Sequence, residues 1–203
     1  MRKIIYQTLV SLDGFVSGPD GELDWHVVTE DMHRVYNDEQ KRFESYIFGR
    51  RTYEVMRFWD DPKLLEPDSP AIYRDFAAGW SRMPKLVVSR TLTKAGPMAR
   101  VVRDNVAAEI RALKQQPGGD ISIGGGAVAA SIRHEGLIDE YDLFIHPVVL
   151  GSGTRLFPPA EGRLDISLIG TTSYPAGVVR LRYATLPSTL PGKSSSNGGD
   201  HHD

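Results

Sequence analysis

The stretch ISIGGGAVAASI, residues 121–132, takes an apolar strand through three glycines into a helix. Glycines let the backbone approach a ligand closely, and the free amides at a helix N-terminus attract an anion such as a pyrophosphate. Gly124, Gly126 and Ala129 also match the G-x-G-x-x-A pattern of dinucleotide-binding folds. A tight turn that needs only unusual dihedrals would give the same letters, so the motif alone leaves both interpretations open.

The place of this motif in the chain argues against the classical dinucleotide-binding fold. That fold has an acidic residue at the end of the next strand, about 20 residues after the glycines. Here the next strand ends near His146-Pro147, and three or four expected strands precede the motif. We therefore expect a phosphate-binding turn in a different α/β fold.

Alternating strands and helices predict a mixed, mostly parallel sheet with helices on both faces. KIIYQTLV, residues 3–10, predicts a buried first strand, and Thr29 is a candidate cap for a helix over about 30–44 that has Phe43 on its inner face. Because the last two strands are joined at residues 175–177, the fold is expected to end in an antiparallel hairpin. The other expected strands are 46–48, 85–89, 120–123, 141–150, 164–174 and 177–186, and the other expected helices begin near Thr52, Ser69-Pro70, Asp104 and Ala127.

Composition indicates one globular domain and excludes several classes of partner. The chain has 203 residues, 40% of them hydrophobic, and a formal net charge of −2, so no basic face for a nucleic acid is expected. The absence of cysteine excludes disulfides and thiolate chemistry and fits a cytoplasmic protein. No stretch approaches the roughly 18 apolar residues of a membrane span, and no metal site is expected. We expect a domain over 1–187 and a flexible polar tail over 188–203.

Two further strand ends carry groups that suit a phosphate. In FGRRTYEVM, residues 49–52 place two guanidinium forks and a hydroxyl where a strand turns into a helix. In PKLVVSRTL, residues 89–91 place two hydroxyls and a cation just past a strand. A solvated basic corner would explain each stretch alone. If the strands are parallel, however, all three ends share one edge of the sheet, which is where open α/β sheets bind ligands.

These stretches, together with VSLDGFVSGPDGELDW and LIDEYDLFIHPVVLGSGTRLF, make most of residues 1–186 resemble a known family. It is the dihydrofolate-reductase-like family that includes the reductase domain of bacterial riboflavin biosynthesis, the RibD C-terminal domain. The resemblance implies a three-layer dihydrofolate-reductase-like α/β fold, NADPH as cofactor and a homodimer. It also implies hydride transfer to a small pteridine-like or pyrimidine-like heterocycle, as in the riboflavin-pathway 5-amino-6-(5-phosphoribosylamino)uracil reductase.

The resemblance also implies which residues meet NADPH. The first basic corner would face its phosphates, the second strand end its adenosine ribose phosphate, the glycine turn its pyrophosphate, and the end of the first strand its nicotinamide. Gly151-Ser152-Gly153 would border the pocket, although a hairpin or bulge explains these glycines equally well. The expected cofactor set is Leu9, Val10, Gly14, Gly49, Arg50, Arg51, Thr52, Ser89, Arg90, Thr91, Gly124, Gly125, Gly126, Ala127 and Val128.

Three carboxylates near the first loop and helix are candidates for the catalytic proton donor. Asp13 lies in an Asp-Gly turn, where it can cap the turn or touch a substrate. Glu30 follows Trp25 by five residues, the spacing that links the loop tryptophan to the pteridine-binding acid in dihydrofolate reductases, and Asp31 is adjacent. A surface or helix-capping role explains each acid as well. Trp25 itself is expected to contact the substrate.

The sequence departs from the folate enzymes directly after Trp25. Residues 25–28 read WHVV, where those enzymes have tryptophan-leucine-proline, so folate reduction does not follow from the resemblance. The chain also lacks the deaminase domain and zinc-binding cysteines that commonly accompany the riboflavin-pathway reductase. Two alternatives to a reductase stay open: a nucleotide-binding or regulatory protein that keeps the cofactor groove without turnover, and an interaction module in which the glycines and arginines only shape turns.

Overall fold

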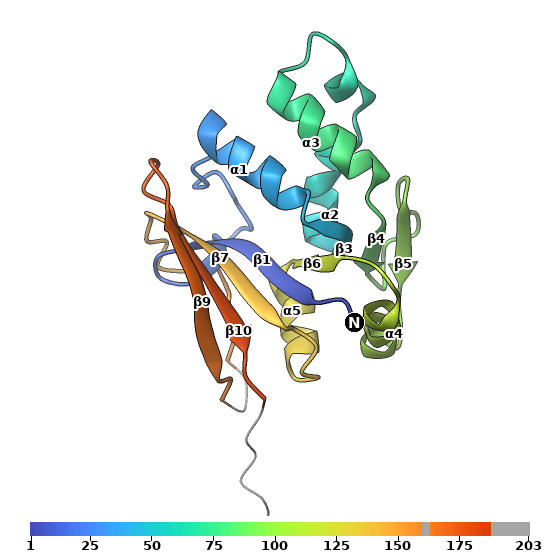
Figure 1. Cartoon of the computed structure of the whole chain (residues 1–203), viewed down its shortest axis with the longest axis vertical. Helices are drawn as coiled ribbons and strands as arrows, with labels where there is room; N and C mark the ends of the chain where they lie inside the picture. The colour runs from blue at the N-terminus through green and yellow to red at the C-terminus, as the bar shows by residue number, and fades with distance from the viewer. Residues whose placement is uncertain (160–162, 188–203) are drawn as a thin grey trace, which may run out of the picture.

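The computed structural model describes residues 1–159 and 163–187, which form a central sheet with helices on both faces (Figure 1). The tail expected over 188–203 lies outside the described residues. The strands are β1 (Ile4–Ser11), β2 (Phe15–Ser17), β3 (Phe43–Gly49), β4 (Lys85–Val88), β5 (Ala99–Val102), β6 (Asp120–Gly124), β7 (Glu140–His146), β8 (Thr154–Arg155), β9 (Ile166–Ser173) and β10 (Val179–Thr185). The helices are α1 (Glu30–Gln40), α2 (Arg50–Met56), η1 (Arg57–Asp60), η2 (Pro62–Leu65), α3 (Ala71–Arg82), α4 (Val106–Gln115) and α5 (Gly126–Arg133).

The main sheet has eight strands in the order β5-β4-β3-β6-β1-β7-β10-β9. All neighbours from β5 to β7 are parallel, whereas β10 is antiparallel to both β7 and β9. A separate antiparallel pair joins β2 to β8. The predicted fold class, a mostly parallel sheet that ends in an antiparallel hairpin, is confirmed.

Both faces of the sheet are apolar because helices cover both. Along β1, Ile4, Tyr6 and Val10 pack in the core between the sheet and helices α4 and α5. On the opposite face, Ile5 packs in the core beneath α2 and α3, and Leu9 packs beneath α1. Successive strand residues point to opposite faces, so a strand covered twice reads as a continuous apolar run. The result is three layers, with α1, α2 and α3 above the sheet and α4 and α5 below it in Figure 1.

The prediction differs from the structure at one helix end, at one strand end and in a missed edge strand. The helix expected to reach residue 44 ends at Gln40, and Phe43 begins β3, where it packs beside Tyr46 in the core beneath α3. The strand expected over 141–150 ends at His146, where Pro147 brings no donor to the ladder. Strand β5 was missed because its four residues form a short, half-exposed edge beside β4.

Most helix starts were predicted to within one residue, whereas α2 begins at Arg50, two residues before the expected Thr52. Thr29 caps α1 as expected, because its hydroxyl accepts a hydrogen bond from the Met32 amide at 3.3 Å. Neither Ser69 nor Asp104 is a cap. The cap of α3 is the next residue, Pro70, and the cap of α4 is Asn105 in a left-handed conformation with φ +53°. In both helices the chain enters helical geometry one residue later than the polar side chain indicated.

A buried ionic cluster joins α1 to β7 and β10. The Arg180 guanidinium donates to Asp142 at 2.7 Å and to Glu39 of α1 at 2.7 Å, and Arg42 contacts the same two carboxylates. The side chains of Asp142 and Arg180 are only 1% and 9% exposed. Charges buried this deeply are tolerated only when paired, so the cluster fixes α1 over the sheet.

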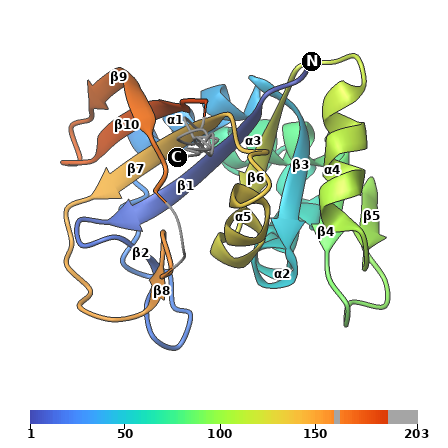
Figure 2. The same cartoon turned by 90° about the horizontal axis from the view of Figure 1, so that it is seen from below.

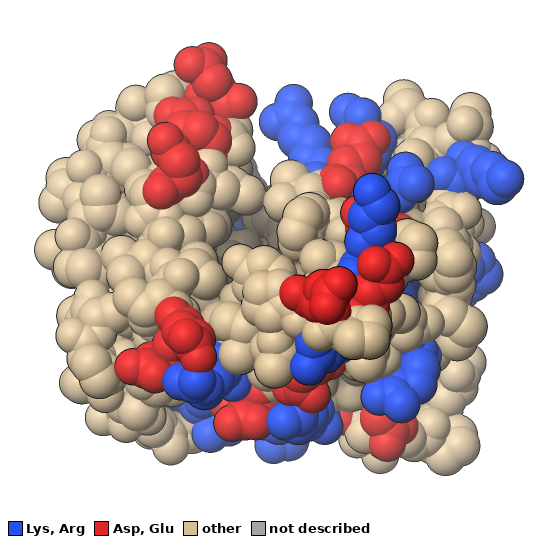
Figure 3. Space-filling model, turned by 90° about the horizontal axis from the view of Figure 1, so that it is seen from above, with Lys and Arg blue, Asp and Glu red and all other residues tan. Residues whose placement is uncertain are grey.

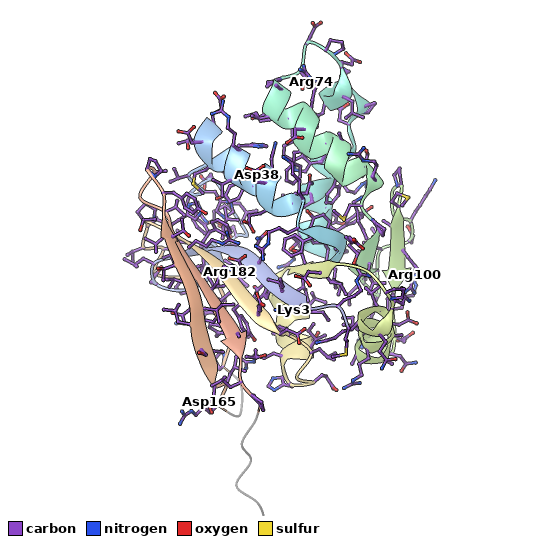
Figure 4. All side chains as sticks on the ribbon, in the orientation of Figure 1. Lys3, Asp38, Arg74, Arg100, Asp165 and Arg182 are labelled. Carbon is purple, nitrogen blue, oxygen red and sulfur yellow. The ribbon has the colours of Figure 1, made fainter. Side chains whose placement is uncertain are left out.

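A second, shallower group of charges lies beside this cluster on the same face of the sheet. Glu140 accepts from Lys3 at 2.7 Å and from Arg182 at 3.3 Å. Figure 4 shows the labelled Lys3 and Arg182 close together in front of the strands. Their long side chains cover the part of the sheet below the end of α1.

Within residues 1–159 and 163–187, no helix combines the length and apolar character that a membrane crossing requires.

Candidate functional site

The carboxyl ends of the parallel strands meet at one edge of the sheet. In sheet order this edge runs from Val88 through Gly49 and Gly124 to Ser11 and His146, the last residues of β4, β3, β6, β1 and β7. Figure 2 shows β1 and β7 side by side with their heads at the same edge, next to β2 and β8. The three strand ends that the sequence singled out therefore belong to adjacent strands.

The glycine turn after β6 packs directly against the corner after β3. Gly125 has φ +104°, and a Cβ there would lie 2.8 Å from the Thr52 hydroxyl and 3.4 Å from the Gly49 amide nitrogen. A Cβ on Gly124 would lie 2.9 Å from the Phe48 ring. The glycines thus serve both an unusual backbone conformation and a close approach. No side chain caps α5, so the amides of its first turn open onto the strand-end edge.

The corner after β3 presents two arginines to solvent. Arg50 and Arg51 are exposed at the start of α2, and Thr52 is half-buried against the glycine turn. Arg50 pairs with Glu54 one helical turn later at 3.1 Å, whereas Arg51 has no hydrogen-bond or ion-pair partner within the described chain. Exposed pairs of this kind contribute only about 0.3–0.5 kcal/mol, so both guanidinium groups are available to an anion.

The corner after β4 is shaped by Ser89. Its side chain is buried, and its hydroxyl oxygen accepts hydrogen bonds from the amides of Thr91 at 3.2 Å and Leu92 at 2.9 Å. Arg90 is exposed and makes no ion pair with any residue that the structure describes. Ser89 therefore builds the turn that carries Arg90 outward, and Arg90 is the group at this corner that can reach a ligand.

The last part of β1 is only partly covered by α1. On this face Gln7 and Leu9 are half-buried, although β1 lies in the middle of the sheet. Figure 3 shows that the surface on the side of α1 and α3 is hollowed between two halves. Basic side chains gather on one side of the upper part of this hollow and acidic side chains on the other. Val10 is 1% exposed within the opposite core, and Gly14 is half-buried in the following turn with φ +87°.

The Asp13 carboxylate is engaged in holding two loops together. It accepts hydrogen bonds from the Ser11 hydroxyl at 2.7 Å and from the amides of Leu150 at 3.1 Å and Gly151 at 2.7 Å. The Ser11 hydroxyl, followed by these backbone amides, lowers the pKa of Asp13 to about 2. The turn after β1 is instead capped by Ser11, whose hydroxyl accepts from the Phe15 amide at 2.9 Å, while Asp13 fastens this turn to the 150–151 loop.

Glu30 and Asp31 do not lie at the strand ends. Both occupy the first turn of α1, where their side chains are 63% and 73% exposed and pair with Arg34. Glu30 and Arg34 line a groove of about 470 Å³ between α1 and α3, to which no strand-end residue contributes. In this arrangement both acids have the surface position that the sequence left open as an alternative to a proton donor.

Trp25 lies beside two histidines that the sequence did not connect with it. Its ring centroid is 4.2 Å from that of His26 and 5.6 Å from that of His146. His146 ends β7 and is paired in register with Ser11 at the end of β1. The histidines were missed because only the strand register brings residue 146 next to residues 25–27. The available signal was a histidine that directly follows the apolar run 143–145 at the end of a strand.

The two glycines of the Gly151-Ser152-Gly153 loop are expected to tolerate substitution differently. Both have positive φ, +75° and +135°, but a Cβ on Gly153 would overlap the Ser17 carbonyl oxygen, while nothing lies within 4 Å of one on Gly151. Gly153→Ala should therefore break the β2–β8 pairing, measured as faster amide exchange in these strands. Gly151→Ala is the matched control and should cost only the backbone strain of about 1–2 kcal/mol. Equal effects would show that this close approach is unimportant.

Known proteins with similar sequences and structures agree with this geometry. The family model described as the RibD C-terminal domain matches residues 2–180. The Bacillus subtilis (strain 168) protein YyaP is 34% identical over 185 residues, which cover 90% of this chain and 94% of YyaP. A pyrimidine reductase-like protein from Corynebacterium diphtheriae has a TM-score of 0.62 at 14% identity, with 92% of this chain and 93% of that chain covered.

A dihydrofolate reductase from Enterococcus faecalis, solved in a complex with NADP(H), has a TM-score of 0.59 at 16% identity, with 90% of this chain and 96% of that chain covered. At this level of identity the solved structures establish the fold, which is that of dihydrofolate reductase. The family match extends over nearly the whole described chain and is independent of them. The chain therefore belongs to the RibD C-terminal domain family, a family of reductase-like proteins.

Proposed function

We propose that this protein is an NADPH-dependent reductase that transfers a hydride to a small pteridine-like or pyrimidine-like heterocycle. The observation that carries the proposal is the contact of the glycine turn with the corner after β3, where Gly125 leaves no room for a Cβ beside Thr52. This contact places the uncapped start of α5 beside the arginines at the neighbouring strand ends. Helix amides and guanidinium groups along one edge suit a ligand with several phosphates.

The expected cofactor contacts follow the order of the strands along this edge. The glycine turn, residues 124–128, would hold the pyrophosphate, and Arg50 and Arg51 would bind phosphate oxygens beside it. Arg90, at the end of the next strand, would meet the ribose phosphate that distinguishes NADPH from NADH. Leu9, on the partly covered end of β1, would border the nicotinamide, which supplies the hydride when it is bound. The residues therefore bind, orient and shield the cofactor, while Trp25 would contact the substrate.

Two solved structures that resemble this chain support the same proposal. One solved relative is described as pyrimidine reductase-like, and another, a dihydrofolate reductase, was solved with NADP(H). Both cover at least 90% of this chain. The corresponding substrate proposal is a heterocycle like that of the uracil reductase of riboflavin biosynthesis. Such a substrate would give this protein a role in that pathway.

A second function, nucleotide binding without turnover, is favoured by the state of the three acids. Reduction of a ring nitrogen or carbonyl group needs a proton donor near the hydride acceptor. Asp13 is held as a carboxylate by its hydrogen bonds, and Glu30 and Asp31 pair with Arg34 on the surface of α1. A protein that keeps the cofactor edge and lacks a donor would bind NADPH and not oxidise it.

NADPH oxidation with a panel of pteridines and aminopyrimidines distinguishes these functions. A reductase should consume NADPH above background with at least one heterocycle, and Arg51→Ala should lower kcat/KM while Arg100→Ala, at an exposed pair with Glu109, should not. Binding of NADPH without oxidation across the panel would favour the second function. If NADPH does not bind at all, both proposals fail.

We also propose a homodimer formed through the C-terminal strands. β9 is the last strand of the sheet, and one of its edges has no partner among the residues that the structure describes. Leu168 and Ile169 are 54% and 45% exposed, and Ile169 lies at the bulge in the pairing of β9 with β10. Edge strands with exposed apolar side chains tend to pair with other chains. Sedimentation should give a dimer that Ile169→Lys shifts to monomer, and a monomeric wild-type protein would contradict the proposal.

A further inference from the structure

A buried pair of imidazoles joins the segment before α1 to the end of β7. His146 is completely buried, and its Nδ1 accepts a hydrogen bond from the Val27 backbone amide at 3.1 Å. The His26 and His146 rings lie with their centroids 5.6 Å apart, and the Trp25 ring packs edge-on against both. Residues 25–27 therefore rest on the end of a central strand through aromatic contacts and one backbone hydrogen bond.

The Val27 amide fixes the position of the proton on His146. A ring nitrogen accepts a hydrogen bond only when it carries no proton, so neutral His146 must carry its hydrogen on Nε2. A second proton would go onto Nδ1 and would place an N–H directly against the N–H of Val27. The hydrogen bond at 3.1 Å cannot survive that change, because a donor would face a donor.

The partner ring is equally unsuited to a positive charge. The Nε2 atoms of His26 and His146 are both buried without a hydrogen-bond partner in residues 1–159 and 163–187. Burial, and then the neighbouring His146, lower the pKa of His26 to about 4, and burial lowers the pKa of His146 as well. Both rings are therefore neutral at pH 7, and each resists protonation while the segment stays in place.

Few charged groups around the pair could compensate a proton. Asp24, in the same segment, is the carboxylate that favours protonated His26. Asp13, in the turn after β1, is already bonded to Ser11 and to the amides of residues 150 and 151. On the side of α1, Tyr36 packs on Phe144, and burial raises the pKa of its phenol, so it stays neutral.

We propose that His26 and His146 form a pH-dependent latch: their neutral rings hold residues 24–27 against the end of β7, and protonation of either ring releases that segment. The latch goes beyond the proposed reductase function and needs no bound cofactor. Its consequence for a ligand site is direct, because Trp25 moves with the segment. The turn after β1 reaches the same place, because the Leu12 amide donates to the Val148 carbonyl, just after His146, at 2.8 Å. The released segment, which rests on His146, therefore adjoins that turn.

Amide exchange measured from pH 7.5 to pH 4.5, and corrected for the intrinsic pH dependence of exchange, tests the latch on the full chain. Protection at residues 25–27 should fall by about tenfold or more as the histidines titrate, while protection in β6 stays constant. His26→Phe keeps an aromatic ring that cannot be protonated and should move the loss of protection to lower pH. His134→Phe is the matched control, because His134 is an exposed histidine at the C-cap of α5. This substitution should leave the transition unchanged.

Nitrogen NMR of labelled histidine in the wild-type protein gives a second readout that needs no variant. At pH 7.5 we expect one buried ring with its proton on Nε2 and a hydrogen-bonded, unprotonated Nδ1, as His146 requires. A His146 ring with its proton on Nδ1 would overturn the proposal. So would protection at residues 25–27 that stays constant to pH 4.5, or that falls identically in the wild type and in His26→Phe. None of these results depends on whether NADPH binds.

Discussion

Gly125→Ala is expected to weaken NADPH binding by about 100-fold, or roughly 3 kcal/mol. The residue has φ +104° and ψ +117°, outside the left-handed helical region, where alanine costs about 1–3 kcal/mol, and its new Cβ would lie 2.8 Å from the Thr52 hydroxyl. The turn must then move away from the corner after β3, and the phosphate-binding groups on the two strands lose their common geometry. Calorimetric titration with NADPH measures the loss.

The control for this substitution is Gly136→Ala. Gly136 also has positive φ, +62°, but nothing lies within 4 Å of a Cβ at that position, which follows the far end of α5. It should lower the free energy of unfolding by a similar strain term and leave the dissociation constant for NADPH unchanged. If both substitutions weaken NADPH equally, binding responds to general stability, and the glycine turn is not part of the site.

Arg180→Met is expected to lower the free energy of unfolding by about 3–5 kcal/mol, the usual cost of leaving buried charges without their partner. Arg180 is 9% exposed at its side chain and bonds both Asp142, which is 1% exposed, and Glu39, which is 13% exposed. After the substitution the only cation that the two carboxylates share among the described residues is Arg42, whose contact with Asp142 is 3.5 Å long, and their other common donor is the neutral amide of Gln7. Urea denaturation followed by circular dichroism measures the change.

Arg100→Met is the matched control, because Arg100 and Glu109 form a pair with side chains 61% and 42% exposed. Its expected cost is below about 1 kcal/mol. Adding Asp142→Asn to Arg180→Met should recover part of the loss, since it removes a buried charge that has lost its partner. A cost for Arg180→Met as small as that of the control would mean that the cluster does not hold α1 on the sheet.

Most of the fold could be predicted because the parallel strands are covered on both faces. The runs at 3–10 and 120–123 are rich in β-branched and apolar residues, and their periodicity and turn residues locate them within a residue. Phe43 shows where this reasoning fails: it continues the spacing of α1 but belongs to β3, where it pairs with Asp120 of β6 and joins the core that includes Phe76 and Trp80 of α3. Tertiary packing decides such positions, and local sequence does not contain it.

The candidate site likewise has parts that the sequence predicts and parts that it does not. The glycine turn and the two arginine corners were found because each has a local reason to exist, and their adjacency follows from parallel strands. The roles of the acids depend on long-range contacts. Asp13 is tied to Gly151, 138 positions away, and His146 meets Val27 across 119 positions. Spacing alone could not separate a carboxylate that fastens two loops from one that faces a substrate.

The most direct test of the central claim is calorimetric titration with NADPH and NADH of the wild type, Arg90→Ala and Arg100→Ala. Arg90 is an exposed cation at the strand end beside the arginine corner, whereas Arg100 lies on the edge strand and pairs with Glu109. We predict that the wild type and Arg100→Ala bind NADPH more tightly than NADH, and that Arg90→Ala binds NADPH about as weakly as NADH. Failure of both dinucleotides to bind the wild-type protein would contradict the account.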